Sequence, residues 1–292
     1  MTATITTTGL PAAGRRGLVR RTLGSRSGAV GAVLVGVVVL GALAATLGLL
    51  PDPLAQAPAQ RLSAPSAAHW FGTDQFGRDV FARSTAGAAA SLSIALVAVA
   101  IAAVAGTAAG VAAGYFRGWS DRSVLGVTNV LFAFPPLLLA LALASAFTRT
   151  WLTVAVAIAI VYTPIFVRVA RGPVLSLREA DFVRATTVLG FSPLRTLARH
   201  VLPNIAPIVI VQVTLSLSWA VLTEASLSFL GLGAPPPAPS LGAMVLEARV
   251  LVNVAWWTMA APGAVIVALV VGLNLLGDGL RDALDPRNGS GR

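Results

Sequence analysis

Side chains that commonly perform catalysis or bind metals are scarce in this chain of 292 residues. The absence of Cys and Lys excludes thiol chemistry, a zinc ribbon and a complete P-loop for nucleotide binding. The two His residues, His69 and His200, are far apart in sequence, so we expect no His-based metal site. We therefore expect no catalytic, cofactor-binding or metal-binding residues here. Any nucleotide site that drives the protein should lie on a different chain.

Residues 176–203 form the longest polar interruption between two apolar halves and have the sequence signals of two short helices. Ser176 and Glu179 have the spacing of a capping box, in which each side chain satisfies a free backbone N–H. Gly190 supplies a stop signal, and Ser192 followed by proline predicts the start of a second helix. A polar, well-capped helix pair between apolar runs is compatible with a surface that another protein binds. A solvated loop is the alternative interpretation.

The first of these predicted helices has a defined face. Phe182, Thr186 and Leu189 follow one another at the four- and three-residue spacing that brings helical side chains together. Several Arg residues along the segment keep it out of hydrocarbon, because a charged side chain is costly there.

A second polar block, GTDQFGRD, comes just before an apolar run. Its glycines suit a tight turn, and its charged side chains are expected to pair with one another inside that turn. The block is interpreted either as part of a docking face or external gate, or as a purely structural lid. Its candidate residues are Gly72, Thr73, Asp74, Gly77, Arg78 and Asp79.

The composition is that of an integral membrane protein. The chain is 56% hydrophobic and 11% charged, whereas soluble domains contain about 25% charged residues. The net charge of +10 comes from Arg residues between apolar spans, so it favours a topology signal over nucleic-acid binding. A span needs about 20 apolar residues. The sequence predicts an all-α protein with six transmembrane helices, at 28–50, 84–116, 123–148, 150–167, 201–223 and 250–277.

The distribution of Arg sets the orientation, because cytoplasmic loops are enriched in positive charge. Arg residues gather in the N-terminal segment, in 168–199 and near the C-terminus, which places both termini in the cytoplasm. The run 28–50 is longer than the apolar region of a signal peptide, so we expect a retained helix. The expected divisions are a cytoplasmic tail (1–27), the first span (28–50), an extracytoplasmic segment (51–83), a five-helix core (84–277) with a cytoplasmic loop (172–204), and a cytoplasmic tail (278–292).

Two polar residues inside apolar runs are candidates for a pathway or gate. Glu224 is the acidic residue set well inside an apolar stretch, and a carboxylate there marks a functional site by default. It lies about 20 residues beyond Asn204, near the external end of its helix, where we expect solvent to reach it. A gate or structural role is favoured over a proton relay. Asn274 lies near the cytoplasmic end of the last run.

Small residues and prolines shape two of the expected spans. Gly106, Gly110 and Gly114 recur at every fourth position, a spacing that lets two membrane helices approach closely. Tolerated glycines in an Ala-rich helix are the alternative. Pro135 and Pro136 lie inside the expected third span and predict a kink, because each proline removes a backbone donor.

Three blocks of the sequence resemble the permeases of ABC importers. The segment 179–203 is similar to their EAA loop, whose pattern is E-A-A, three residues, Gly, nine residues and I-x-L-P; the positions in register are Ala185, Gly190, Leu202 and Pro203. The departures are Arg184, Thr186 and His200, where the family usually has Glu, Ala and Ile. The blocks 71–121 and 223–249, with the C-terminal NLLGDGLRDALDPR, resemble the dipeptide, oligopeptide and nickel branch, and within it the C-type partner of the permease pair.

This resemblance implies a type I ABC-importer permease fold in a bacterial inner membrane. It implies a second permease, two cytoplasmic ATPases that bind ATP and Mg²⁺, an external solute-binding protein and a peptide substrate moved by alternating access. The chain would not itself be an enzyme. The helix from Asp181 to Gly190 would be the coupling helix, with Phe182 and Leu189 supplying contact area. The Glu usually found at the position of Arg184 is missing, which puts a specific salt bridge there in doubt.

Three alternatives stay open. Within the same family, import of nickel or another small solute is the runner-up to peptide import. An ion-coupled secondary transporter would be expected to show intramembrane carboxylates or inverted repeats, and we find Glu224 and no evident repeat. A membrane scaffold or receptor would not need proline-kinked spans and usually carries an extramembrane domain.

Overall fold

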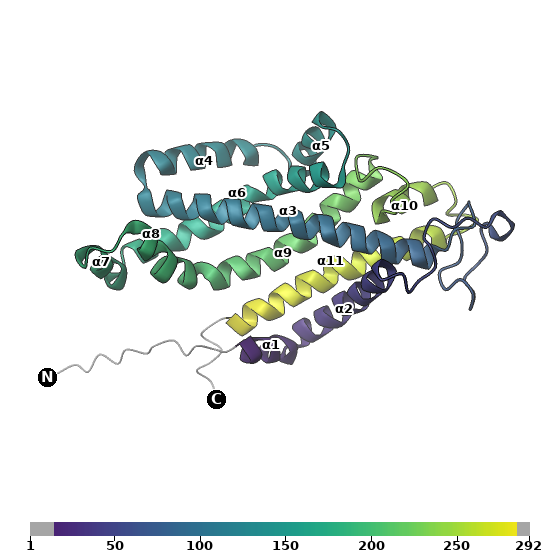
Figure 1. The fold of residues 1–292 in the computed structure, drawn as a ribbon, viewed down its shortest axis with the longest axis horizontal. Helices are drawn as coiled ribbons and strands as arrows, with labels where there is room; N and C mark the ends of the chain where they lie inside the picture. The colour runs from purple at the N-terminus through teal and green to yellow at the C-terminus, as the bar shows by residue number, and fades with distance from the viewer. Residues whose placement is uncertain (1–14, 285–292) are drawn as a thin grey trace.

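The computed structural model describes residues 15–284, so the terminal parts of the predicted tails, 1–14 and 285–292, lie outside the described residues. The predicted all-α class is confirmed. Within 15–284 the β pairing is limited to one isolated bridge between Thr73 and Asp79. The α-helices (Figure 1) are α1 (Arg15–Gly24), α2 (Arg26–Thr46), α3 (Val80–Phe116), α4 (Gly118–Phe132), α5 (Pro136–Ala146), α6 (Trp151–Arg178), α7 (Asp181–Val188), α8 (Pro193–Thr196), α9 (Leu202–Phe229), α10 (Leu241–Ala248) and α11 (Trp257–Leu284).

Five helical stretches of the described chain are long and apolar enough to cross a membrane. They are α2, α3, α6, α11 and the continuous stretch Pro193–Phe229, in which a π-helical turn, Leu197–Val201, joins α8 to α9. Pro203 is the second residue of α9, which begins directly after this π-helical turn. A sixth span is present if α4 and α5 are counted together.

The third predicted span, 123–148, is not one kinked helix. It is two helices, α4 and α5, bent by 94° across a short break. Proline disfavours the helical conformation of the residue before it, and two successive prolines extend that restriction over two positions. Pro135 accordingly has an extended ψ of 129° and Pro136 opens α5. The predicted kink is thus a complete break.

Other boundaries move because local or tertiary contacts extend the helices. The predicted N-terminal tail contains α1, which Ser25 separates from α2 by capping the N–H of Gly28 at 3.1 Å. Part of the predicted C-terminal tail continues α11 to Leu284. The apolar run 150–167 is only part of α6, since the helix continues to Arg178 and takes in seven residues of the predicted loop 172–204.

The extension of α6 is stabilised by contacts to α4. Arg171 donates to both oxygens of Asp121, at 2.6 and 2.7 Å, in the bidentate geometry that suits a guanidinium and a carboxylate. One turn earlier, Arg168 donates to Asn129 at 3.1 Å and lies 3.9 Å from the ring centre of Phe132. These contacts hold α4 alongside α6 and allow two arginines to lie within a long apolar helix.

The structure places Gly106, Gly110 and Gly114 against α6. A Cβ atom at Gly106 would lie 2.6 Å from the carbonyl oxygen of Thr163, and one at Gly114 would lie 2.9 Å from Val174 Cγ1. At Gly110 it would overlap the backbone of α6. The small side chains are therefore required by the close α3–α6 contact. Figure 1 shows these two helices side by side in the centre of the molecule.

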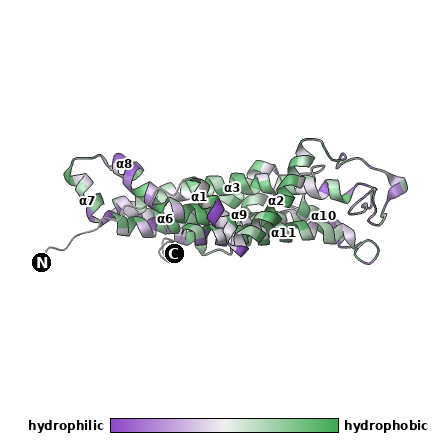
Figure 2. Ribbon diagram, turned by 90° about the horizontal axis from the view of Figure 1, so that it is seen from below, coloured by the Kyte–Doolittle hydropathy of each residue, from purple (hydrophilic) through white to green (hydrophobic). Residues whose placement is uncertain are grey.

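Polar groups gather at the two ends of the long axis. One end carries α7 and α8, and α1 and the end of α11 lie in that half of the molecule (Figure 1). The other end carries α10 and the segment between α2 and α3. Figure 2 shows hydrophilic residues at both ends and mostly apolar helices between them. The predicted coupling segment and GTDQFGRD block are thus at opposite ends.

Candidate functional site

The polar segment after α6 folds into two short helices, as predicted, but the first starts differently. Ser176 lies in the last turn of α6, and α7 begins at Asp181 after Ala180, whose side chain makes no capping hydrogen bond. The predicted capping box of Ser176 and Glu179 is therefore wrong, because α6 continues through Ser176. The predicted stop is correct: Gly190 has φ +73°, a conformation that favours glycine, and the N–H of Phe191 donates to the carbonyl oxygen of Thr186 at 2.9 Å.

The second helix starts as predicted. Ser192 caps α8 by accepting from the N–H of Arg195 at 3.4 Å, and Pro193 occupies its first position. The hydroxyls of Thr186 and Thr196 lie 3.0 Å apart and join the two helices. Both threonines are buried.

The predicted common face of Phe182, Thr186 and Leu189 is only partly right. Thr186 is buried toward α8, whereas Phe182 and Leu189 are 48% and 70% exposed. The four-residue α8 covers Thr186 but neither end of α7, which accounts for the difference. Val188 is 87% exposed, so the end of α7 presents large apolar side chains that no described residue covers. The other candidate residues of the segment, Asp181, Ala185, Leu202 and Pro203, are exposed.

Glu179 joins α7 to the corner between α3 and α4. Its Oε2 accepts from Arg184 Nη2 at 2.5 Å, and its Oε1 accepts from Arg117 Nη1 at 3.4 Å. The hydrogen bond and charge of Arg184 lower the pKa of the Glu179 carboxyl, so this ion pair is formed at neutral pH. Arg184 thus has a carboxylate partner within its own chain.

Glu224 lies in α9 and is 1% exposed, which corrects the expectation that solvent reaches it. Its two oxygens accept from Ser91 of α3 at 2.5 Å and from Ser228 at 2.7 Å. The start of α10 packs beside it, since a Cβ atom at Gly242 would overlap the carbonyl of Ala225. α10 therefore excludes the solvent that position along the helix alone would allow.

Asn274 has a similar role between α11 and α9. Its Oδ1 accepts from the hydroxyl of Ser218 in α9 at 3.1 Å, and its Nδ2 donates to the carbonyl oxygen of Val270 at 2.9 Å. A polar group in an apolar region is stable when it is hydrogen-bonded in this way. Glu224 and Asn274 are not brought together, because each bonds separate partners.

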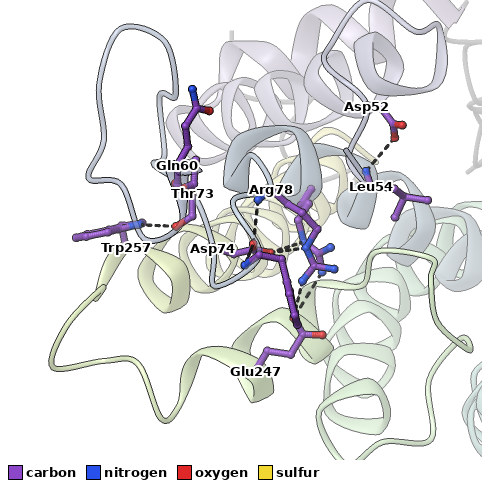
Figure 3. A network of polar contacts seen from close by, with 10 residues as sticks. Asp52, Leu54, Gln60, Thr73, Asp74, Arg78, Glu247 and Trp257 are labelled. Atoms are coloured by element: carbon purple, nitrogen blue, oxygen red, sulfur yellow. Dashed lines mark hydrogen bonds and ion pairs between the residues drawn. The ribbon is translucent and has the colours of Figure 1, made fainter. Parts of the chain in front are cut away.

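The GTDQFGRD block forms a compact turn at the end opposite α7. Gly72 and Gly77 have φ of +70° and +74°. Asp74 accepts from the N–H groups of Phe76 at 2.8 Å and Arg78 at 3.0 Å, and from Arg78 Nε at 2.6 Å. Asp79 caps α3 through the N–H of Ala82 at 2.8 Å. The internal polar pairing is thus present (Figure 3).

This turn is attached to the start of α11 and to α10. Thr73 donates from its hydroxyl to the carbonyl oxygen of Gln60, and its own carbonyl accepts from Trp257 Nε1 at 3.2 Å. Arg78 Nη2 donates to Glu247 of α10 at 3.3 Å. Figure 3 shows Glu247 reaching toward Asp74 and Arg78 from below. The turn therefore links three parts of the chain at this end.

Sequence reasoning missed several residues of these networks, among them Ser91, Arg83 and Glu247. Ser91 and Glu247 depend on tertiary contacts over more than 100 positions. The sequence does contain a signal for Arg83, because a charged residue one turn into an otherwise apolar helix marks a candidate functional site. Its side chain is 5% exposed.

The chain belongs to the family described as binding-protein-dependent transport system inner membrane component, whose family model matches residues 106–290. With its apolar helices, this makes it a multi-pass protein of the bacterial inner membrane and a permease component of the ABC importers. The match includes α7, α9 and α11 and begins inside α3.

Several relatives cover most of the chain. It is 42% identical over 230 residues to the dipeptide transport system permease protein DppC of Alkalihalophilus pseudofirmus, covering 79% of this chain and 76% of that protein. It is 41% identical to the glutathione transport system permease protein GsiD of Pectobacterium atrosepticum, covering 76% and 74%. It is 40% identical to the probable D,D-dipeptide transport system permease protein DdpC of Escherichia coli, covering 82% and 80%.

Proposed function

We propose that this chain is one permease subunit of an ATP-driven importer of di- and oligopeptides, and forms the translocation pathway with a second, related permease. Two cytoplasmic ATPases bind ATP and Mg²⁺ and perform the hydrolysis, and an extracytoplasmic solute-binding protein delivers the peptide. Transport proceeds by alternating access. The family supports the permease role, and the names of the relatives favour peptides over nickel or another small solute.

The exposed apolar side chains at both ends of α7 are the observation that carries this proposal. Phe182, Val188 and Leu189 are exposed on a helix capped by Gly190, at one end of the long axis. Burying such a side chain against a partner gains about 1.5–3 kcal/mol. We infer that α7 is the coupling helix and that it seats in a groove of an ATPase on the cytoplasmic side.

The contacts around α7 connect it to the long apolar helices. Arg184 and Arg117 share the carboxylate of Glu179, so a displacement of α7 acts on the corner between α3 and α4 as well as on α6. Arg184, which replaces the usual Glu, acts inside this chain in the proposal. The ion-coupled transporter centred on Glu224 is less well supported, since both oxygens of Glu224 are held by serines.

Co-purification tests the proposal directly. The tagged chain, extracted gently from its membrane, should bring with it a second permease and two ATPases, and the reconstituted complex should take up peptides. Phe182→Asp should lower uptake about tenfold or more, because it places a charge in an apolar contact. Leu54→Asp at the opposite end, where Leu54 is 39% exposed, is the matched control and should leave ATPase binding unchanged. A chain that purifies alone, with Phe182→Asp transporting normally, would contradict the proposal.

A further inference from the structure

Arg83 is a buried cation whose hydrogen bonds are incomplete. Its Nε lies 3.6 Å from Asp74 Oδ2 and its Nη2 lies 3.6 Å from Glu247 Oε2, both longer than a hydrogen bond. Its Nη1 has no hydrogen-bond partner among the described residues. A guanidinium has five N–H donors and stays charged, and burying it without acceptors is costly. Nη1 of Arg83 is therefore left without an acceptor within the described part of the chain.

Space for that acceptor exists beside Arg83. A cavity of about 20 Å³, enough for one water-sized group, is lined by Arg83, Glu247 and the buried side chains of Val80 and Met244. The lining also includes Asp74, Gln75 and Thr258, and the apolar side chains among the lining residues strengthen a charge-assisted hydrogen bond made inside the cavity. Its lining residues come from the GTDQFGRD turn, the first turn of α3, α10 with the segment that follows it, and the start of α11.

The two carboxylates already present are held very differently. Asp74 is committed to its own turn, with three hydrogen bonds of 2.6–3.0 Å from Phe76 and Arg78. Glu247 is 43% exposed and reaches Arg78 only at 3.3 Å. Glu247 can therefore leave without breaking a strong contact, whereas Asp74 cannot.

We propose that Arg83, together with Arg78, is an exchangeable carboxylate-binding site on the extracytoplasmic face, from which an incoming carboxylate displaces Glu247. When Glu247 swings out, Arg78 and Arg83 face Asp74 alone, and the remaining positive charge matches one carboxylate. An oxygen that enters the cavity meets Nη1, and its pair meets Nη2, in the fork geometry that arginine offers. The exchange also breaks the contact between the turn and α10.

The carboxylate has two possible sources, the C-terminus of a peptide and an acidic side chain of the soluble binding protein. The inference rests on the proposed function, because it takes this face to be the side from which both arrive. The test uses the complete importer in nanodiscs. One arm measures binding of alanyl-alanine and of its C-terminal amide without the soluble protein. The other measures the affinity for the peptide-free soluble protein.

Arg83→Gln should weaken binding about tenfold or more in one of the two arms, since it removes a charge-assisted pair. Glu247→Gln should strengthen binding in the same arm, because it removes the competing carboxylate and keeps both arginines. Arg249→Gln, the same charge change at an exposed neighbour of α10, should have no effect. If the peptide is the source, the amide should bind the wild-type importer as weakly as the free acid binds Arg83→Gln.

The proposal is overturned if Arg83→Gln matches Arg249→Gln in both arms. It is also overturned if Glu247→Gln weakens binding, since Glu247 would then be a fixed partner and not a competitor. If the Arg83→Gln importer does not assemble, the Glu247→Gln variant alone tests the proposal: stronger binding supports it and weaker binding overturns it. A wild-type importer that assembles but takes up no peptide would contradict the proposed function, while the arm with the soluble protein would still test Arg83.

Discussion

At the scale of single residues, the structure shows how a carboxylate is accommodated inside an apolar helix. Glu224 is completely buried, and each of its oxygens accepts from one serine hydroxyl. Ser91 comes from α3 and Ser228 from α9 itself, so the side chain joins two helices where α10 packs over them. This arrangement predicts a fixed structural pin and not a group that exchanges with solvent.

Glu224→Ala should therefore destabilise the purified importer by about 1–3 kcal/mol, because it leaves two buried hydroxyls without an acceptor. Glu224→Gln keeps an oxygen acceptor and should cost less while leaving peptide uptake nearly unchanged. Thermal unfolding of both variants, followed by uptake assays in proteoliposomes, measures these effects. Loss of uptake in a Glu224→Gln variant that folds normally would indicate that Glu224 acts as a gate and not as a structural residue.

At the scale of helices, the α3–α6 contact depends on three glycines. Gly110→Ala should destabilise the protein by about 1–3 kcal/mol, because the added methyl group overlaps the backbone of α6. Gly126→Ala in α4 is the matched control, since a Cβ atom there meets nothing within 4 Å. The control should be neutral or gain up to about 1 kcal/mol from helix propensity. Equal unfolding temperatures for the two variants would contradict the packing argument.

Features that depend on a few neighbouring residues were predictable from the sequence. The Gly190 stop, the Ser192 cap and the tight GTDQFGRD turn are all set by side chains within five positions. The start of α7 was mispredicted because Ser176 and Glu179 fit a cap equally well whether or not α6 continues. The burial of Glu224 depends on how α3 and α10 pack against α9, which residue spacing does not contain.

At the scale of the whole molecule, the proposed membrane orientation and the proposed contacts with partner subunits both depend on which polar end faces the cytoplasm. The absence of cysteine makes this accessible to labelling, since any introduced cysteine is unique in the chain. Ser66→Cys and Thr187→Cys place exposed thiols near the GTDQFGRD turn and on α7, respectively. A membrane-impermeant maleimide added to spheroplasts should label Ser66→Cys at once and Thr187→Cys only after lysis. Labelling of Thr187→Cys in intact spheroplasts would reverse the proposed topology.

The length of α3 has a mechanical consequence. Its 37 residues extend about 55 Å at about 1.5 Å per residue, well beyond a hydrocarbon core of about 30 Å. The helix packs against α6, α9 and α2, with Arg83 near one end and the three glycines near the other. A tilt of about 5° around these glycines would move the far end by several ångströms. If the ATPases bind at α7 as proposed, a small movement at that end would thus become a larger displacement at the opposite surface, without any helix having to unfold.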